Sequence, residues 1–471
     1  MEKFNLMLDR IVDQMVWGWP LLTIILVFAL YFSFRTRFAT IRYIPLMPKL
    51  ILQKNSDDEK MSAFQSINLI LANHLGTGNI IGVASAILYG GPGAILYMCL
   101  ISIFASSLSF AENTLGQMYK TEIDHEYRGG AAYYILRGLK SPFWAHFIAF
   151  AFFVALGHFM PTIQAATIST AMHQTFQIPK YIIGLVVSMF IGLIIIGRTR
   201  RIMLWAEVLV PFMSIFYMLI VLVIIAFNFS KLDDVFLLIV QSAFHKRAFF
   251  GGMIGSAINF GVRRGLFTNE AGLGSAPNIL SSANVKHPVH QGLISAFSVF
   301  IDTIVMCTLT AVVILITDSF NVMGENGYIY QGLPGVAYEE YVQIAVGTVF
   351  KDFGAVFVAI AIFLFGFTAL FSGYYNSQTN LIFLFKKGRK LKIANFIYQI
   401  IFLFIIFFSS IYDTSLAWKL TDVGVGIAYL LHLFVLFLLS SQVVNVLKDF
   451  EHKQKTNDPT PYRNPDLECW K

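Results

Sequence analysis

The chain has 471 residues, of which 13% are charged and 56% are hydrophobic, and its mean hydropathy is +0.67. A soluble protein of this length needs about twice that charged fraction to cover its surface, so a soluble enzyme, a nucleic-acid binder and a secreted disulfide scaffold are excluded. The three cysteines are far apart in sequence and have neither metal-binding nor disulfide spacing. The composition predicts an all-α polytopic membrane protein, in contact with the lipid bilayer, with no nucleic-acid partner and no cofactor.

Runs of about 20 apolar residues predict membrane-spanning helices, because that length crosses the hydrocarbon core of a bilayer. Eleven such runs occur, at residues 16–35, 62–89, 93–118, 143–173, 180–197, 202–228, 249–282, 290–316, 353–384, 394–412 and 417–446. Two further connectors, near 232–245 and 336–350, are expected to form helices at the membrane surface.

The distribution of Lys and Arg predicts the orientation. With eleven spans the termini lie on opposite sides of the membrane, and 26 of the 34 basic residues fall on one side, in the segments 35–60, 120–140, 198–201, 263–286, 386–392 and the C-terminal tail. Basic residues accumulate on the cytoplasmic side. We therefore expect a multi-pass protein of the cell membrane with its N-terminus outside and its C-terminus in the cytoplasm, and the net charge of +7 reflects topology.

Glycine clusters interrupt two of the spans. The second contains the run from Asn73 to Asn79, and the seventh is glycine-rich from Gly251 to Gly274. Glycine weakens a helix by about 1 kcal/mol relative to alanine, so both spans are expected to be broken. Each opens a set of five spans, and because five is odd the second set is inverted relative to the first, an arrangement typical of secondary transporters.

These breaks divide the chain into four predicted parts. Residues 1–61 form an extra N-terminal helix with a basic amphipathic connector, 62–228 and 229–446 form the two five-helix repeats, and 447–471 form a disordered cytoplasmic tail.

Three motifs identify a family. Residues 76–84 read Gly-Thr-Gly-Asn-Ile-Ile-Gly-Val-Ala and precede Gly-Gly-Pro-Gly-Ala at 90–94; residues 263–278 read Arg-Arg-Gly-Leu-Phe-Thr-Asn-Glu-Ala-Gly-Leu-Gly-Ser-Ala-Pro-Asn; residues 302–311 begin Asp-Thr-Ile-Val. In this order they resemble the signature of the alanine or glycine:cation symporter family. The resemblance implies ten helices in the five-plus-five inverted-repeat fold also seen in neurotransmitter:sodium symporters. It also implies sodium-coupled uptake of small neutral amino acids, alanine or glycine, with glutamine in some members.

The break in the second span suits this task. It frees backbone N–H groups that can bind a substrate carboxylate, and the resemblance assigns that role to Gly76, Thr77 and Gly78. Carbonyl groups near Ala72 and Leu75 are freed as well and can bind a dehydrated sodium ion. Because ion and substrate order the same segment, each is expected to raise the affinity for the other.

Two polar residues are carried over from the family motifs. Residues 163–168 resemble the run around a substrate-contacting glutamine, so Gln164 is expected to form a polar wall of the site; an interhelical hydrogen bond is the alternative. Asn269 matches the interrupted seventh span and either lines the site or has a capping and packing role.

The ninth span departs from the family. Residues 365–375 resemble a stretch with two adjacent hydroxyl residues and a later tryptophan. Thr368 keeps the first hydroxyl and is expected to bind sodium, whereas Ala369 lacks the second and Gly373 replaces the tryptophan. The lost ligand weakens the sodium assignment. The lost indole predicts room at Gly373 for a substrate larger than alanine, unless Tyr374 fills the space.

The histidine beside the break leaves an alternative coupling ion open. His74 stands where the family has a small residue, and histidine titrates near physiological pH, so protons are the alternative to sodium. A neutral His74 hydrogen-bonded inside the bundle is the favoured interpretation. Asn79 is expected to act in coupling or in shaping the broken helix.

Acidic residues within or at the ends of apolar spans are costly and are usually functional or paired; they are Glu112, Glu207, Glu270 and Asp302. A structural role is favoured for Glu270, paired with Arg263 or Arg264, and for Asp302, while the roles of Glu112 and Glu207 stay open. A channel or a membrane enzyme is less favoured than a symporter. There is no repeated filter element, and the nearest histidine pair, His287 and His290, has no neighbouring carboxylate in the sequence.

Overall fold

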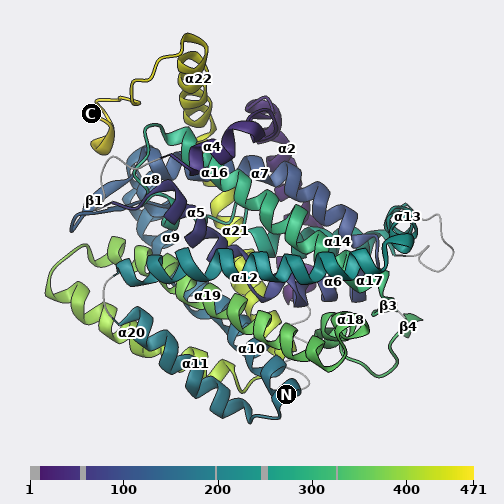
Figure 1. The fold of residues 1–471 in the computed structure, drawn as a ribbon. Coiled ribbons are helices and arrows are strands. Elements are labelled where there is room, and N and C mark those ends of the chain that lie inside the picture. The colour runs from purple at the N-terminus through teal and green to yellow at the C-terminus, as the bar shows by residue number, and fades with distance from the viewer. Residues whose placement is uncertain (1–10, 54–59, 197–198, 245–252, 325–326) are drawn as a thin grey trace.

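Helices form nearly all of the regular structure in the computed structural model, which describes residues 11–53, 60–196, 199–244, 253–324 and 327–471 (Figure 1). Seven helices of these described ranges are long and apolar enough to cross a membrane. The other predicted spans are shorter apolar helices or the two interrupted ones. The predicted all-α polytopic fold is therefore confirmed.

Ten of the spans form two successive sets of five, and each set begins with an interrupted helix. The first set contains α5 (Ala63–His74) with α6 (Ile81–Gly90), α7 (Ala94–Met118), α9 (Pro142–Val154) with α10 (Met160–Phe176), α11 (Lys180–Ile195) and α12 (Thr199–Phe227). The second contains α14 (Ile254–Asn269) with α15 (Ala276–Leu280), α16 (Pro288–Val299) with α17 (Thr308–Ile316), α19 (Asp352–Phe385), α20 (Arg389–Ser409) and α21 (Thr414–Leu438). The extra helix α2 (Trp19–Arg35) precedes both sets.

Shorter elements connect the spans. They are η1 (Ile11–Val16), α3 (Ala39–Arg42), η2 (Ile44–Leu46), α4 (Met47–Ile51), α8 (Ala131–Gly138), η5 (Phe229–Lys231), α13 (Leu232–Ala243), η8 (Tyr338–Glu340) and α18 (Tyr341–Phe350). Two antiparallel hairpins pair β1 (Thr121–Ile123) with β2 (Glu126–Arg128), and β3 (Asn321–Gly324) with β4 (Gly327–Gln331). Figure 1 shows these hairpins at opposite sides of the helical bundle.

Local chemistry explains where the interrupted helices stop. A capping box at Ser62 and Gln65 starts α5. The helix ends at His74 because Gly76 is extended, and Thr77–Asn79 form a single 3₁₀ turn, η3, before α6 begins. In the second break, Gly272 and Gly274 have φ of +85° and +89°, which glycine adopts without steric cost.

Two further helices contain π-helical stretches. η4 (Ala155–Phe159) joins α9 to α10, and η7 (Phe300–Cys307) joins α16 to α17. Such stretches occur frequently at functional sites because they redirect side chains on an otherwise regular helix. Both of them contribute residues to the polar interior described below.

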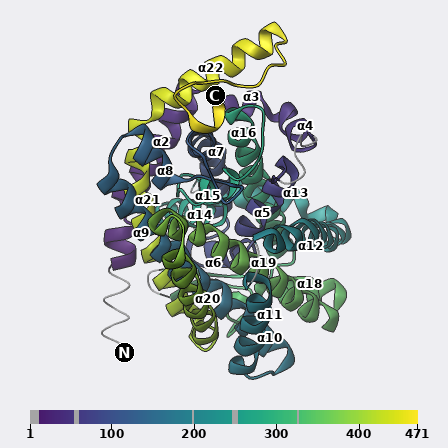
Figure 2. The same cartoon turned by 90° about the vertical axis from the view of Figure 1, so that its left-hand side faces the viewer.

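Helix α7 runs through the middle of the bundle and packs against α2, α14 and α16, while α10 packs against α19 and α21 (Figure 2). Glycines allow the closest approaches. A Cβ on Gly261 would lie 2.4 Å from the backbone oxygen of Ala94, and a Cβ on Gly292 would lie 2.7 Å from that of Phe110. Small residues at such crossings bring helix backbones together, as expected in a membrane.

The prediction of a disordered tail over 447–471 is wrong. Helix α22 (Ser440–Thr456) continues through the first part of it, and η9 (Glu468–Trp470) ends the chain against the bundle. Trp470 is buried and donates a hydrogen bond from Nε1 to the backbone oxygen of Gln117 at 2.8 Å. Arg137 pairs with Glu468 at 2.6 Å. The composition is that of a solvated tail, but buried aromatic side chains, Trp470 among them, and these polar contacts order it.

Candidate functional site

The break in the first interrupted helix contacts a glutamine of α10. Thr77 N–H donates to Gln164 Oε1 at 3.0 Å, while Gly76 N–H donates to Asn79 Oδ1 at 3.0 Å and to His74 O at 2.8 Å. A Cβ on Gly76 would lie 2.9 Å from Gln164 Nε2, so only glycine lets the amide lie this close to the chain. The structure thus brings Gly76, Thr77 and Gln164 together.

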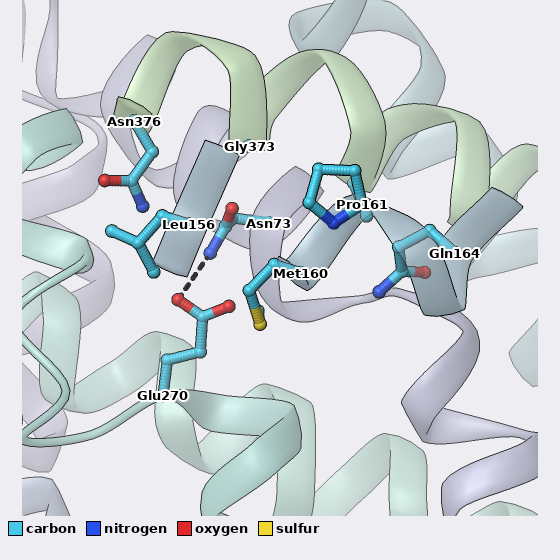
Figure 3. Close-up of a pocket in the computed structure, with 9 residues that line it drawn as sticks. Asn73, Leu156, Met160, Pro161, Gln164, Glu270, Gly373 and Asn376 are labelled. Atoms are coloured by element: carbon cyan, nitrogen blue, oxygen red, sulfur yellow. Dashed lines mark hydrogen bonds between the residues drawn. The ribbon is translucent and has the colours of Figure 1, made fainter. Parts of the chain in front are cut away.

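A cavity of about 10 Å³ lies beside this contact (Figure 3), which is about the least that a cavity needs to hold one water molecule. Four segments line it: the end of α5, the α9–η4–α10 helix, the second break, and α19. The lining residues are Asn73, Leu156, Met160, Pro161, Gln164, Glu270, Ala369, Gly373 and Asn376. Three amides and one carboxylate therefore face apolar side chains across a narrow space.

The backbone at Gly373 leaves space for a small side chain. A Cβ added there would have its nearest neighbour, the Leu156 backbone oxygen, at 4.0 Å. Tyr374 does not fill the space. Its ring stacks on Tyr398 with centroids 5.3 Å apart, and its hydroxyl donates to Asn395 at 3.1 Å, on the side of α19 that faces α20.

Two other predicted substrate residues lie away from the cavity lining. Gly78 packs against α14, where a Cβ would lie 3.0 Å from Thr268 Cγ2. Asn269 donates to Ser102 Oγ at 3.0 Å and to Thr303 Oγ1 at 2.9 Å, and its Oδ1 accepts from Ala271 N–H at 3.0 Å. Of the two roles left open for Asn269, these contacts describe capping and packing.

Asn79 connects the first break to the α16–α17 helix. Its Nδ2 donates to Asp302 Oδ1 at 2.6 Å, while its Oδ1 accepts from Gly76 N–H. Asp302 also accepts from Thr303 Oγ1 at 2.8 Å. The carboxylate therefore fixes the Asn79 side chain, which in turn holds the backbone turn that precedes α6.

The predicted sodium ligands lie at the first break and on α19. Gly76 N–H bonds to His74 O, so the carbonyl of Ala72 is released from the helical pattern, and Leu75 follows it in the unwound segment. The Thr368 hydroxyl instead donates to Phe365 O at 3.0 Å. One turn later on the same helix, Ser372 Oγ donates to Leu69 O at 3.0 Å and so reaches α5 directly. The i, i+4 spacing from Thr368 was the signal that could have found Ser372.

The predicted pairing of Glu270 with Arg263 or Arg264 is wrong. Both guanidinium groups bind Asp422 of α21, with Nη2 of Arg263 and of Arg264 at 2.5 and 3.3 Å from Oδ2. Glu270 instead accepts hydrogen bonds from Asn73 Nδ2 at 2.7 Å and from Ser275 Oγ. Glu270 is in the αL conformation (φ 51°) and caps the C-terminal end of α14, whereas the arginines lie inside that helix.

The other acids and the histidine considered in the sequence contact segments around the cavity. Glu112 accepts from Gly274 N–H at 2.9 Å and so caps the second break, where His432 Nδ1 also contacts Gly272 O at 2.7 Å. Glu207 of α12 accepts from Gln65 Nε2 at 3.2 Å. His74 is buried, does not line the cavity, and has Nδ1 3.5 Å from Ser298 Oγ.

Sequence reasoning missed several cavity residues. Asn73, Leu156, Met160 and Asn376 carried no assigned role, and Glu270 was placed elsewhere. Asn376 follows Gly373 by three residues, so helical spacing places both on one face of α19. Met160 precedes Gln164 by four residues on α10, so the same spacing could have found it. Leu156 lies in the π-helical stretch before α10, where regular helical spacing does not apply.

Two interrupted helices at corresponding positions, with a polar cavity between them, define a secondary active transporter. The sodium:alanine symporter family matches residues 1–464 of this sequence. The chain therefore belongs to the sodium:alanine symporter family, which consists of transporters and not of enzymes.

Relatives cover almost the whole chain. A carrier protein of Bacillus subtilis is 40% identical over 94% of this chain and 92% of its own length. The "Sodium/proton-dependent alanine carrier protein" of Bacillus sp. strain PS3 is 36% identical over 87% of this chain and 92% of its own. The "Sodium/alanine symporter AgcS" of Methanococcus maripaludis is 33% identical over 94% and 97%. Among solved structures, a manganese transporter of Eremococcus coleocola covers 80% of this chain and 77% of its own, with 12% identity and a TM-score of 0.49.

Proposed function

We propose that the protein is a sodium-coupled symporter that carries small neutral amino acids of the alanine and glycine class into the cytoplasm by alternating access. The observation that carries the proposal is the contact between Thr77 N–H and Gln164 Oε1 beside the cavity. Gln164 Oε1 accepts the hydrogen bond from the Thr77 N–H group, which is the donor that a substrate carboxylate would use. On binding, the carboxylate takes this N–H and the Gln164 amide presents its own NH₂ group instead.

Coupling follows from the same segment. The carbonyl groups of Ala72 and Leu75, with hydroxyl groups from Thr368 or Ser372 on α19, supply the oxygen ligands that a sodium ion prefers. An ion there holds α19 against the first half-helix and orders the Thr77 N–H for the substrate. The two ligands then raise each other's affinity reciprocally. Proton coupling is the alternative, since the strain PS3 relative is named as sodium- and proton-dependent.

The open wall at Gly373 supports a substrate range that extends beyond alanine towards glutamine-sized side chains. A relative from Bacillus subtilis, 36% identical over 98% of this chain and 95% of its own, is named "Probable sodium/glutamine symporter GlnT". The small cavity requires side chains such as Met160 to move when any amino acid enters. The distribution of basic residues supports insertion in the cell membrane with the C-terminus in the cytoplasm.

The test is uptake of labelled alanine, glycine and glutamine into proteoliposomes containing the purified protein, under imposed sodium, proton or no gradients. We expect accumulation that requires sodium and persists with a proton ionophore. Gln164→Ala is expected to lower the rate of alanine uptake at least tenfold. Gln454→Ala removes an exposed amide on α22, away from the cavity, and is the matched control. Uptake that ignores sodium and collapses with the ionophore would establish proton coupling in its place.

A further inference from the structure

Glu270 is an acid held at the edge of the cavity by other residues. Its side chain is 1% exposed, and both of its described hydrogen bonds reach the same oxygen, Oε2, from Asn73 Nδ2 at 2.7 Å and from Ser275 Oγ. Figure 3 shows the second carboxyl oxygen turned towards Met160 and the cavity. Oε2 is thus fixed by Asn73 and Ser275, and the other carboxyl oxygen faces the space that a ligand would enter.

No basic side chain of the described residues lines this cavity. The two arginines of α14, Arg263 and Arg264, are engaged by Asp422. A carboxylate that is buried within a membrane protein without a cation carries a large desolvation cost. A ligand that brings a positive charge into the cavity removes this cost and is therefore favoured there.

The cavity also has two chemically different ends. Gln164 lies at one end, next to the Thr77 N–H, and Asn73, Glu270 and Asn376 lie at the other, with Met160 and Pro161 between them (Figure 3). The first end offers hydrogen-bond donors and suits an anion. The second offers a negative charge and suits a cation. A zwitterion carries both groups on one carbon atom.

We propose that Glu270 binds the α-ammonium group of the transported amino acid and restricts transport to substrates that carry this group. Asn73 and Ser275 are positioning residues that hold Oε2 so that the other oxygen faces the substrate. The inference rests on the proposed function, since it assigns the second half of the same binding site. A ligand that has the carboxyl group but lacks the ammonium group would leave the buried Glu270 carboxylate without a cation, so the site rejects it.

The test is competition against labelled alanine in proteoliposomes, using glycine, propionate and lactate with the wild-type protein and with Glu270→Gln and Glu270→Asp. In the wild type, propionate and lactate are expected to compete at least tenfold less well than glycine. Glu270→Gln removes the charge but keeps the shape, and should raise the KM for alanine roughly 10- to 100-fold, the range of a charge-assisted hydrogen bond. Glu270→Asp keeps the charge and should recover part of the affinity. Glu207→Gln, the same chemical change on α12, is the matched control and should leave the KM unchanged.

Other outcomes overturn the proposal. An unchanged KM in Glu270→Gln shows that the ammonium group binds elsewhere. If that variant alters only the sodium dependence of uptake, Glu270 is a ligand of the coupling ion; if it alters only the pH profile, it carries a proton. Should the variant fail to fold, equal competition by propionate and glycine in the wild type still refutes the assignment. A wild-type protein that accumulates no amino acid refutes the proposed function itself, and the inference with it.

Discussion

At the scale of single residues, Gly373 contributes no side chain to the wall of the cavity. The flexible side chains of Leu156 and Met160 also line the cavity, and Tyr374 packs on Tyr398 and donates to Asn395. Side chains of increasing size at position 373 would therefore extend this part of the cavity wall.

Substitution at Gly373 is expected to narrow substrate selection. Gly373→Ala adds a methyl group whose nearest neighbour lies at 4.0 Å, so folding and alanine uptake should be retained. Gly373→Trp fills the space, and the uptake of glutamine should fall at least tenfold relative to that of alanine. The measurement is the ratio of the two initial uptake rates in proteoliposomes. Equal glutamine-to-alanine ratios in the wild type and both variants would show that this wall does not limit the substrate.

At the scale of elements, a buried charge cluster ties the second interrupted helix to α21. Arg264 lies over the ring of Trp418 at 3.9 Å, and both arginines of α14 share Asp422. Trp17 of the N-terminal segment donates to the Asp422 backbone oxygen at 2.9 Å. Asp422 thus contacts both the N-terminal segment and the second interrupted helix.

Asp422→Asn is expected to destabilise the protein by about 3–5 kcal/mol, because it leaves two buried guanidinium groups without their carboxylate. The measurement is thermal unfolding of purified protein in detergent, read as a lowered midpoint. Glu451→Gln, which makes the same change in the partly exposed pair with Arg42, is the control and should unfold near the wild-type temperature. Equal midpoints for the two variants would show that the buried cluster adds no stability.

At the scale of the whole molecule, the C-terminal segment binds the ends of several helices together. Trp470 covers Lys120, whose Nζ lies 4.9 Å from the indole ring, 4.0 Å from the Tyr127 ring and 3.0 Å from Ala283 O. Lys120 follows α7, and Ala283 follows α15, so this contact joins the central helix to the second interrupted one.

The free energy of unfolding is expected to rise with pH because Lys120 is buried in this contact. Burial lowers the pKa of Lys120 to about 7, whereas in the unfolded chain the amine has its ordinary pKa of about 10.4. Between about pH 7 and pH 10 the unfolded state binds more protons, so the free energy of unfolding increases with pH in this window. Thermal unfolding at about pH 7 and pH 9 measures the effect, and Lys120→Met should reduce the difference. An unchanged difference in that variant would place the titrating group elsewhere.

The sequence by itself determined the spans and both helix breaks. Apolar length and glycine placement act locally, and they report directly on bilayer thickness and on the cost of glycine in a helix. Gly76, Thr77, Gln164 and Gly373 were found by motif, and the structure brings them to one cavity or next to it.

Only the tertiary structure decided the partners of the ionisable groups. Glu270 accepts a hydrogen bond from Asn73 of α5, and Arg263 and Arg264 bind Asp422 on α21. Trp470 packs the charged C-terminal segment against the bundle. Each of these outcomes depends on distances between segments far apart in the chain. No local pattern encodes those distances, because they arise only when the two sets of helices pack together.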